Sequence, residues 1–220
     1  MRIQRAPSVW KSSKRRSQSH KTFSTFSRRT KRLFETIYRS TDLKRSCSIF
    51  LRTVVHSEKS NHDGALIEAV TLPWFEIIEI LQHDPRAAFE ITDRKWEEII
   101  AGAYKAAGFD SVVLTPRSGD YGRDVIAEKR GIGVVRVIDQ VKAYKPHVLV
   151  KANDVRALMG VLHADGAAKG FVTTTSDFAP RLINDPLIAP LIPSRLGLIN
   201  GTQLLERLIE IAKGFDTSCK

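Results

Sequence analysis

Hydrophobic residues recur every three or four positions in two segments, 73–81 and 92–107, and this spacing predicts two amphipathic helices. Pro73 suits the first position of the first helix, because its missing N–H would have no partner there. Thr92 or Asp93 can cap the free N–H groups at the start of the second helix. The second helix is expected to stop before the glycine at position 108.

The second predicted helix carries the more informative pattern of polar and apolar positions. When its residues are placed at about 100° per step, one apolar stripe forms and Glu97 lies at the edge of that stripe, beside Tyr104. An acid in this position faces partly inward, so Glu97 is a candidate functional residue as well as a possible surface acid. The stripe itself consists of Trp96, Ile99, Ile100 and Ala103.

The hydrophobic period then changes from 3.6 to 2, which predicts β-strands. Three consecutive strands are expected at 111–115, 124–129 and 134–144, with a hairpin turn at Gly131 and Gly133 between the last two. A helix, two more strands and a closing helix follow. The predicted order is α-β-β-β-α-β-β-α, an α/β fold with a mixed sheet flanked by helices. The later elements are expected at 155–162 (capped by Asn153 or Asp154), 170–175, 196–199 and 203–212 (opened by Thr202), with a loop at 177–195 that has room for one short helix.

Charge is distributed very unevenly along the 220 residues. The whole chain holds 35 Lys+Arg and 24 Asp+Glu, a formal net charge of +11, yet residues 1–50 alone hold 14 basic and 2 acidic side chains, a balance of 14 − 2 = +12. The sequence therefore predicts a near-neutral domain with a cationic N-terminal arm. The arm is read as a flexible tail or an over-extended start, as a tether for nucleic acid, or as a targeting peptide.

These patterns divide the chain into four parts. We expect a basic arm at 1–60, a helical lead-in at 61–91, the main domain at 92–213 and a short tail at 214–220. The longest uncharged apolar stretches fall short of the roughly 18–20 residues that span a bilayer, so no membrane partner is expected. The two cysteines form no CxxC pair, and a reducing compartment, the cytoplasm, is the expected location.

The candidate chemistry lies in the three consecutive strands. Period-2 geometry puts Gln140 and Lys142 on one face of the third strand and Asp139 on the other. If the second and third strands form a hairpin, Asp124 lies beside Gln140, so a carboxylate, an amide oxygen and a lysine converge at one end of the sheet. Each residue has an ordinary explanation by itself: turn chemistry for Asp124 and a solvated charge for Lys142. Their joint arrangement suits metal-assisted cleavage of a phosphodiester, because Mg²⁺ takes one or two carboxylates and borrows other ligands from the phosphate.

From about Thr92 to Ile211, the chain resembles the Mrr-like restriction endonucleases, a branch of the PD-(D/E)XK nuclease superfamily. The resemblance implies a restriction-endonuclease-like α-β-β-β-α-β core. The segments that carry it are Trp96-Glu97, Gly108-Phe109, Ser118-Gly-Asp-Tyr-Gly-Arg-Asp124-Val-Ile-Ala, Gln140-Val-Lys142-Ala-Tyr, Val155-Arg-Ala-Leu-Met-Gly160, Gly170-Phe-Val-Thr-Thr-Thr-Ser-Asp-Phe178 and Leu198-Ile-Asn-Gly-Thr-Gln-Leu204.

The resemblance also implies roles for five residues. Asp124 is similar to the metal-binding aspartate, Gln140 occupies the second ligand position, and the backbone carbonyl of Val141 supplies a further oxygen. Lys142 corresponds to the catalytic lysine, and Glu97 to an acid on the helix that supports the metal or its water. The implied cofactor is Mg²⁺, with Mn²⁺ as a possible substitute. Gln140 stands where the superfamily pattern has an acid, although the Mrr-like branch itself uses glutamine there.

The expected function is therefore a metal-dependent DNA endonuclease of the restriction and defence type. Its expected partners are DNA and, for cleavage of both strands, a second copy of the chain. The alternative is a noncatalytic nucleic-acid-binding module that keeps the nuclease fold. An unrelated small-molecule enzyme lacks support, because the chain has no glycine-rich phosphate loop and no nucleophile elbow. Candidate contacts to DNA phosphates are Arg117, Arg123, Lys145 and Lys151.

Overall fold

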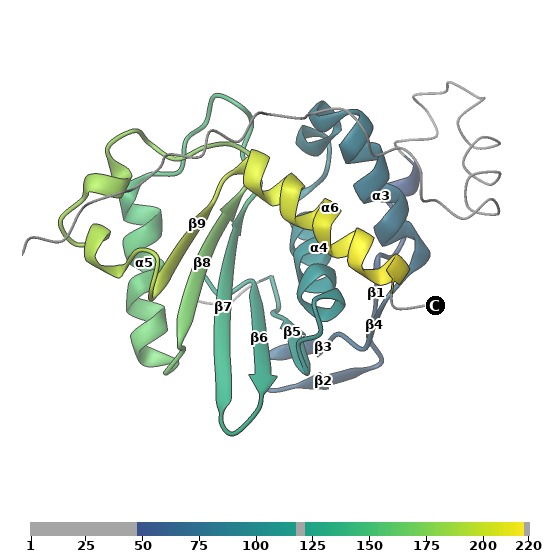
Figure 1. Cartoon of the computed structure of the whole chain (residues 1–220), viewed down its shortest axis with the longest axis horizontal. Helices are drawn as coiled ribbons and strands as arrows, with labels where there is room; N and C mark the ends of the chain where they lie inside the picture. Colours follow the sequence, from purple (N-terminus) through teal and green to yellow (C-terminus); the bar gives the residue numbers. More distant parts are fainter. Residues whose placement is uncertain (1–47, 118–121, 218–220) are drawn as a thin grey trace, which may run out of the picture. The chain divides into compact units, whose positions relative to one another are not determined.

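The computed structural model describes residues 48–117 and 122–217, and all of them belong to one compact unit, Leu43–Lys220. Its centre is a seven-stranded sheet in the order β2-β3-β5-β6-β7-β8-β9 (Figure 1). The first five strands in this order pair antiparallel, whereas β7, β8 and β9 pair parallel. The strands are β2 (Lys59–Asn61), β3 (Gly64–Leu66), β5 (Ser111–Leu114), β6 (Val125–Arg130), β7 (Val134–Lys142), β8 (Lys169–Thr174) and β9 (Leu196–Ile199).

Helices cover both faces of the sheet and bury two hydrophobic clusters. On one face, apolar residues of β5 and β6 pack with α3 (Leu72–His83), α4 (Asp93–Ala106) and α6 (Gly201–Thr217). On the other face, Ile138 of β7 and Val172 of β8 pack against α5 (Ala152–Ala164). The predicted α/β class, with a mixed sheet flanked by helices, is confirmed.

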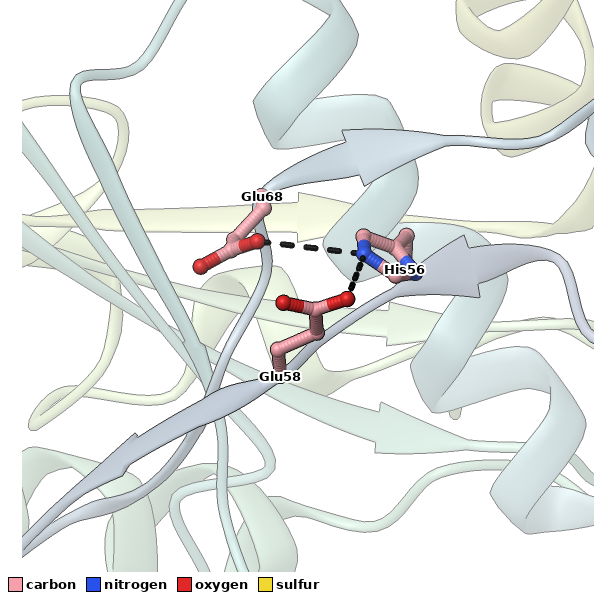
Figure 2. A group of neighbouring side chains, drawn as sticks. All are labelled: His56, Glu58 and Glu68. Atoms are coloured by element: carbon pink, nitrogen blue, oxygen red, sulfur yellow. Dashed lines mark ion pairs between the residues drawn. The ribbon is translucent and has the colours of Figure 1, made fainter.

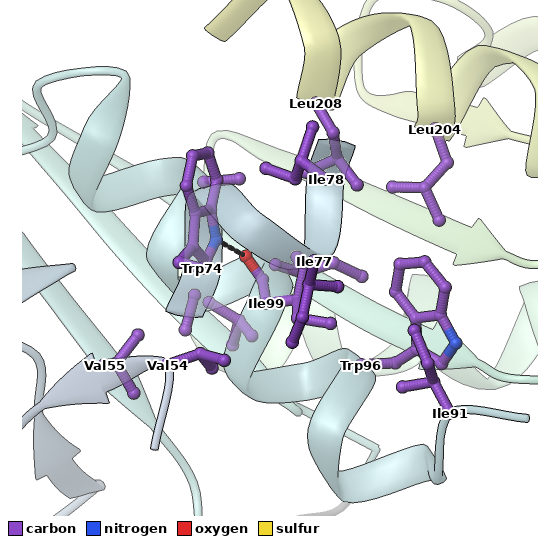
Figure 3. Packing of buried hydrophobic residues seen from close by; sticks show 14 of the residues in the cluster. Val54, Val55, Trp74, Ile77, Ile78, Ile91, Trp96, Ile99, Leu204 and Leu208 are labelled. Atoms are coloured by element: carbon purple, nitrogen blue, oxygen red, sulfur yellow. Dashed lines mark hydrogen bonds between the residues drawn. The ribbon is translucent and has the colours of Figure 1, made fainter. Parts of the chain in front are cut away.

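The larger cluster is organised around Trp74 of α3 (Figure 3). Its side chain is fully buried, and its indole Nε1 donates a hydrogen bond to the backbone oxygen of Ile99 in α4 at 2.9 Å. Gly102 allows α4 to approach this closely, because a Cβ at that position would lie 2.6 Å from the same Nε1. Trp74 and Gly102 thus form a close contact between the two predicted helices, with one buried hydrogen bond added to their apolar packing.

The predicted elements of the main domain are found within a few residues of their expected bounds, but two predicted caps differ. The start of α5 is stabilised by Asp154 from inside its first turn, where the carboxylate accepts a hydrogen bond from the Lys151 N–H at 3.0 Å. At α6, Asn200 accepts from Gln203 N at 3.1 Å, so Asn200 and not Thr202 caps that helix. The predicted loop at 177–195 contains two short 3-10 helices, η2 (Leu182–Asn184) and η3 (Ala189–Leu191).

The segment before α3 differs more from the expectation. Residues 1–47 of the predicted arm lie outside the described residues, but residues 48–60 are folded, and Val54 and Val55 are buried in the larger cluster. The segment 61–91, predicted as a helical lead-in, contains strands as well as a helix, because β3 and the end of β2 lie within it. A separate two-stranded sheet pairs β1 (Val55–His56) with β4 (Ala69–Val70). Strands of two or three residues are too short to produce a hydrophobic period. No helix in the described ranges is long and apolar enough to cross a membrane.

Candidate active site

Asp124 and Gln140 lie opposite each other at one end of the β6–β7 hairpin. The register pairs Val125 with Asp139 and Ile126 with Ile138, so the next position back sets Asp124 against Gln140. The backbone N–H of Asp124 donates to the Asp139 carbonyl at 3.2 Å, which extends the pairing to this point. The structure therefore brings these two predicted site residues together, at the edge of the sheet where β6 begins and β7 ends.

The Asp124 carboxylate reaches across to the backbone of β7. Its Oδ2 accepts a hydrogen bond from the Val141 N–H at 2.6 Å, between the two residues whose side chains face the predicted site. The Asp124 carbonyl is held in turn by Thr115, whose N–H and Oγ1 both donate to it at 3.1 Å. Asp124 is thus fixed between the end of β5 and the end of β7. Val141 contributes its N–H to this arrangement, while its side chain packs against the larger hydrophobic cluster, on the face of the sheet that α4 covers.

Gln140 has a buried oxygen that lacks a partner. Gln140 is only 6% exposed, and its Oε1 has no hydrogen-bond partner among the described residues. Its amide nitrogen faces Gly122, which has a φ of +80° and where a Cβ would lie 2.8 Å from Nε2. Glycine is therefore required at 122 by backbone conformation and by space. Asp120 lies outside the described residues.

Lys142 follows two positions later on the same face of β7 as Gln140. It is half-buried, and its backbone oxygen accepts hydrogen bonds from Thr174 Oγ1 at 2.7 Å and from the Thr175 N–H at 3.3 Å. These contacts tie the end of β7 to the end of β8. The threonines at 173–175 are all buried, so in this structure they support the strand ends and do not present free hydroxyl groups.

Glu97 is linked to the site through an arginine. Its carboxylate pairs with Arg94 at 2.7 Å, and the same nitrogen of Arg94 donates to the Thr115 carbonyl at 2.8 Å. Thr115 is the residue that holds Asp124 from the β5 side. An open pocket of about 670 Å³ adjoins this point and is lined in part by Arg94, Glu97, Arg117 and Lys145.

The strand pattern gave no role to Asp139, a buried acid of β7 that lies next to Gln140 in the sequence. It is 2% exposed and lies on the opposite face of β7 from Gln140, where its Oδ2 accepts from Tyr104 of α4 at 2.9 Å and from Thr173 of β8 at 3.0 Å. Burial raises the pKa of Asp139 to about 7. The negative charge of Asp124 adds to this effect, and the two hydrogen bonds oppose it. The signal in the sequence was a single acid on an otherwise apolar face of the strand.

Two of the candidate phosphate contacts are occupied within the protein. Arg123 pairs with Asp165 at 3.0 Å and with Asp63 at 3.8 Å, and Arg136 joins the same two acids. This network connects the β2–β3 turn to the end of α5 on the face of the sheet that carries Gln140. The ammonium of Lys145 donates to the backbone oxygen of Phe89. Arg117 is exposed beside the pocket and remains a candidate phosphate contact.

The donor set at the sheet edge fits a hard divalent cation. Asp124 offers a carboxylate, and Gln140 offers a buried oxygen that has no partner within 48–117 and 122–217, which is an unfavourable state unless something binds it. A soft metal is disfavoured because no sulfur or imidazole lies among these residues. Asp124 and Gln140 are thus the residues that could hold a cation here.

Comparison with known proteins places these features in a family context. Residues 89–208, more than half of the chain, match the family model Mrr_cat, which describes a restriction endonuclease. Among solved structures, the chain is similar to the restriction endonuclease MspJI in complex with a 27-mer oligonucleotide, with 19% identity, a TM-score of 0.39, and coverage of 63% of this chain and 31% of that one. It is also similar to the DNA modification-dependent restriction endonuclease AspBHI, with 14% identity, a TM-score of 0.40, and coverage of 68% and 41%. The chain thus spans less than half the length of either protein. No curated protein matches it.

Proposed function

We propose a nuclease function from a simple starting point: this chain belongs to the Mrr-like restriction endonuclease family. It hydrolyses phosphodiester bonds in DNA at the edge of the sheet where β6 begins and β7 ends. The family resemblance inferred from the sequence is confirmed over residues 89–208. The observation that carries the proposed site is the strand register, which sets Asp124 opposite Gln140 with Lys142 on the same face of β7. The alternation of side chains along a strand makes this convergence a property of the backbone.

Asp124 and Gln140 are proposed to hold a divalent metal ion, Mg²⁺ or Mn²⁺, with the Val141 carbonyl as a further oxygen. When bound, such an ion polarises the phosphoryl oxygen and lowers the pKa of bound water. The hydrogen bond from Val141 N–H to Asp124 Oδ2 at 2.6 Å fixes the position of one carboxylate oxygen. Because the carboxylate is planar, the direction of its other oxygen is restricted as well. Gln140 brings no charge, so of the two side-chain ligands proposed on the strands only Asp124 is negatively charged.

Lys142 and Glu97 are proposed to act on the water and the phosphate. The ammonium of Lys142 orients the attacking water and offsets the negative charge that grows on the phosphoryl oxygens as the new P–O bond forms and the bond to the leaving oxygen breaks. Glu97 acts from α4, where its ion pair with Arg94 positions it beside the strand end that holds Asp124. In the metal-loaded enzyme Glu97 supports the water or the cation.

DNA is the proposed substrate, in keeping with a restriction and defence role in the cytoplasm. One such site cuts one strand, so cleavage of both strands at one position calls for two copies of the chain, and we propose a homodimer for that reaction. Arg117 is the proposed contact to the sugar-phosphate backbone, because it is exposed beside the pocket that Glu97 lines.

The test is cleavage of methylated and unmethylated plasmid by the full chain, with Mg²⁺ or Mn²⁺ and with EDTA. Nicked or linear product should appear with metal and disappear in EDTA, and Lys142→Ala should abolish it. Lys213→Ala, which removes an exposed lysine of α6, is the matched control and should cut as the wild type does. If the wild type binds DNA but cuts no plasmid under any of these conditions, the chain is a noncatalytic binding module.

A further inference from the structure

A second group of metal-ligating side chains lies far along the chain from the proposed active site. His56, Glu58 and Glu68 come together where the β1–β4 sheet meets the β2–β3 hairpin (Figure 2). All three precede residue 89, where the match to the restriction endonuclease family begins. The group therefore belongs to the described residues before the family match, 48–88, which we call the N-terminal addition, and the proposed catalytic role does not account for it.

Strand pairing fixes the backbone positions of the three residues. His56 pairs with Ala69 across β1 and β4, and its carbonyl accepts a hydrogen bond from the Glu68 N–H at 2.9 Å. Glu58 is two residues beyond His56, and its carboxylate points back toward the same imidazole in Figure 2. Two ligands thus come from one stretch of chain and the third from its cross-strand neighbour.

The spacing of the ligand atoms suits a small transition-metal ion. His56 Nε2 lies 3.2 Å from Glu58 Oε1 and 3.9 Å from Glu68 Oε2, and the three ligand atoms all lie within 4.8 Å of one another. Ligands bound to Zn²⁺ at about 2.0–2.2 Å in a tetrahedron are separated by roughly 3.4 Å. The imidazole of His56 and the carboxylate of Glu58 are mostly exposed, with side-chain exposures of 52% and 72%, so small rotations can close the remaining gap.

We propose that His56, Glu58 and Glu68 form a binding site for a divalent transition metal of the Zn²⁺ type. One imidazole and two carboxylates suit Zn²⁺, whereas Mg²⁺ is bound by oxygen ligands alone. Lys59 contacts the other oxygen of Glu68, Oε1, at 3.5 Å and leaves Oε2 directed at His56. Three protein ligands leave a fourth position for water. The bound metal joins the segment that carries β1 to the segment that leads into β4, and so stabilises the N-terminal addition.

The experiment is a calorimetric titration of the full chain with Zn²⁺, in excess Mg²⁺ to occupy the proposed active site. The parent protein carries Cys47→Ser and Cys219→Ser, so that neither thiol competes for the metal. One Zn²⁺ should bind per chain. His56→Ala and Glu58→Gln should each weaken binding by more than about tenfold, since losing even an indirect partner of a metal ligand costs roughly 10–100-fold.

His62→Ala is the matched control, because His62 is an exposed histidine in the same region that pairs with Asp63 and takes no part in the group. It should bind Zn²⁺ as the parent does. Because the Glu58 side chain is exposed, Glu58→Gln keeps the test valid even if His56→Ala is poorly folded. The proposal is overturned if the parent binds no Zn²⁺ at 100 µM, or if both His56→Ala and Glu58→Gln bind it with the parent's affinity. Plasmid cleavage in Mg²⁺ should be the same for all four proteins, which separates this result from the test of the nuclease.

Discussion

Replacing Asp139 by asparagine removes a buried ionisable group from β7 and should flatten the pH dependence of the free energy of unfolding. The carboxyl group has a pKa of about 7 in the folded chain, against an ordinary value of 3.8, chiefly because burial disfavours its charged form. The folded state therefore keeps a proton that the unfolded state releases. The contribution of Asp139 to the free energy of unfolding is therefore most favourable below about pH 4. It falls as the pH rises toward 7 and is constant above that pH.

The expected size of the effect follows from the shift. The two values differ by roughly 3 pH units, and at about 1.36 kcal/mol per unit the group costs about 4 kcal/mol between pH 4 and pH 7. Asparagine can still accept hydrogen bonds from Tyr104 and Thr173 through its carbonyl. Its amide nitrogen would stand where the Asp139 Oδ1 has no partner among the described atoms. That last cost, about 1–3 kcal/mol, does not depend on pH.

The assay is urea unfolding followed by circular dichroism at several pH values, with EDTA present so that no divalent cation alters the charge near Asp139. The wild type should lose about 4 kcal/mol more than Asp139→Asn between pH 4 and pH 7. Ionisable groups that do not interact with Asp139 contribute equally to both proteins and cancel in the difference. Parallel pH profiles for the two proteins would show that the folded chain does not keep Asp139 protonated near neutral pH.

Two further predictions concern packing and the N-terminal segment. Gly102→Ala should lower the free energy of unfolding in urea by about 1–3 kcal/mol, because its Cβ would lie 2.6 Å from Trp74 Nε1. The control Gly160→Ala, on an open face of α5, should leave the free energy of unfolding unchanged or raise it. Equal losses of stability in both variants would contradict the close contact at Gly102. Deleting residues 1–47 should leave the melting temperature unchanged and reduce the salt dependence of DNA binding. Deleting residues 1–60 should also destabilise the domain, because it removes buried core residues. An unchanged salt dependence of DNA binding would argue that the arm is not a tether for nucleic acid.

The sequence predicted the core of the fold well wherever a periodic pattern was long enough. The helix at Asp93–Ala106 and the strand at Val134–Lys142 were found because their apolar positions repeat over several turns or pleats. Strands β1 to β4 were missed, since two or three residues cannot show a period and their pairing depends on partners distant in the chain. The same limit explains why the predicted arm extended to residue 60, past Val54 and Val55.

The proximity of Asp124 and Gln140 was predictable because hairpin geometry fixes which residues face each other across two strands. What the strand pattern could not give was the chain of contacts around them. The link from Glu97 through Arg94 to Thr115 joins residues far apart in sequence, as does the clamp of Tyr104 and Thr173 on Asp139. Such contacts depend on how α4 packs against the sheet, which hydrophobic periodicity leaves open.

The proposed active site is tested most directly by comparing DNA binding and DNA cleavage in the same protein. Asp124→Asn keeps the size of the side chain but removes the negative charge that the proposed aspartate ligand brings to the metal. Asp124→Asn should bind plasmid DNA in Mg²⁺ as tightly as the wild type, while its single-turnover rate of nicking should fall by at least about 10³-fold. Glu210→Gln, which removes an exposed acid from α6, should bind and nick as the wild type does. Nicking by Asp124→Asn at the wild-type rate would contradict the assignment of the active site to this edge of the sheet.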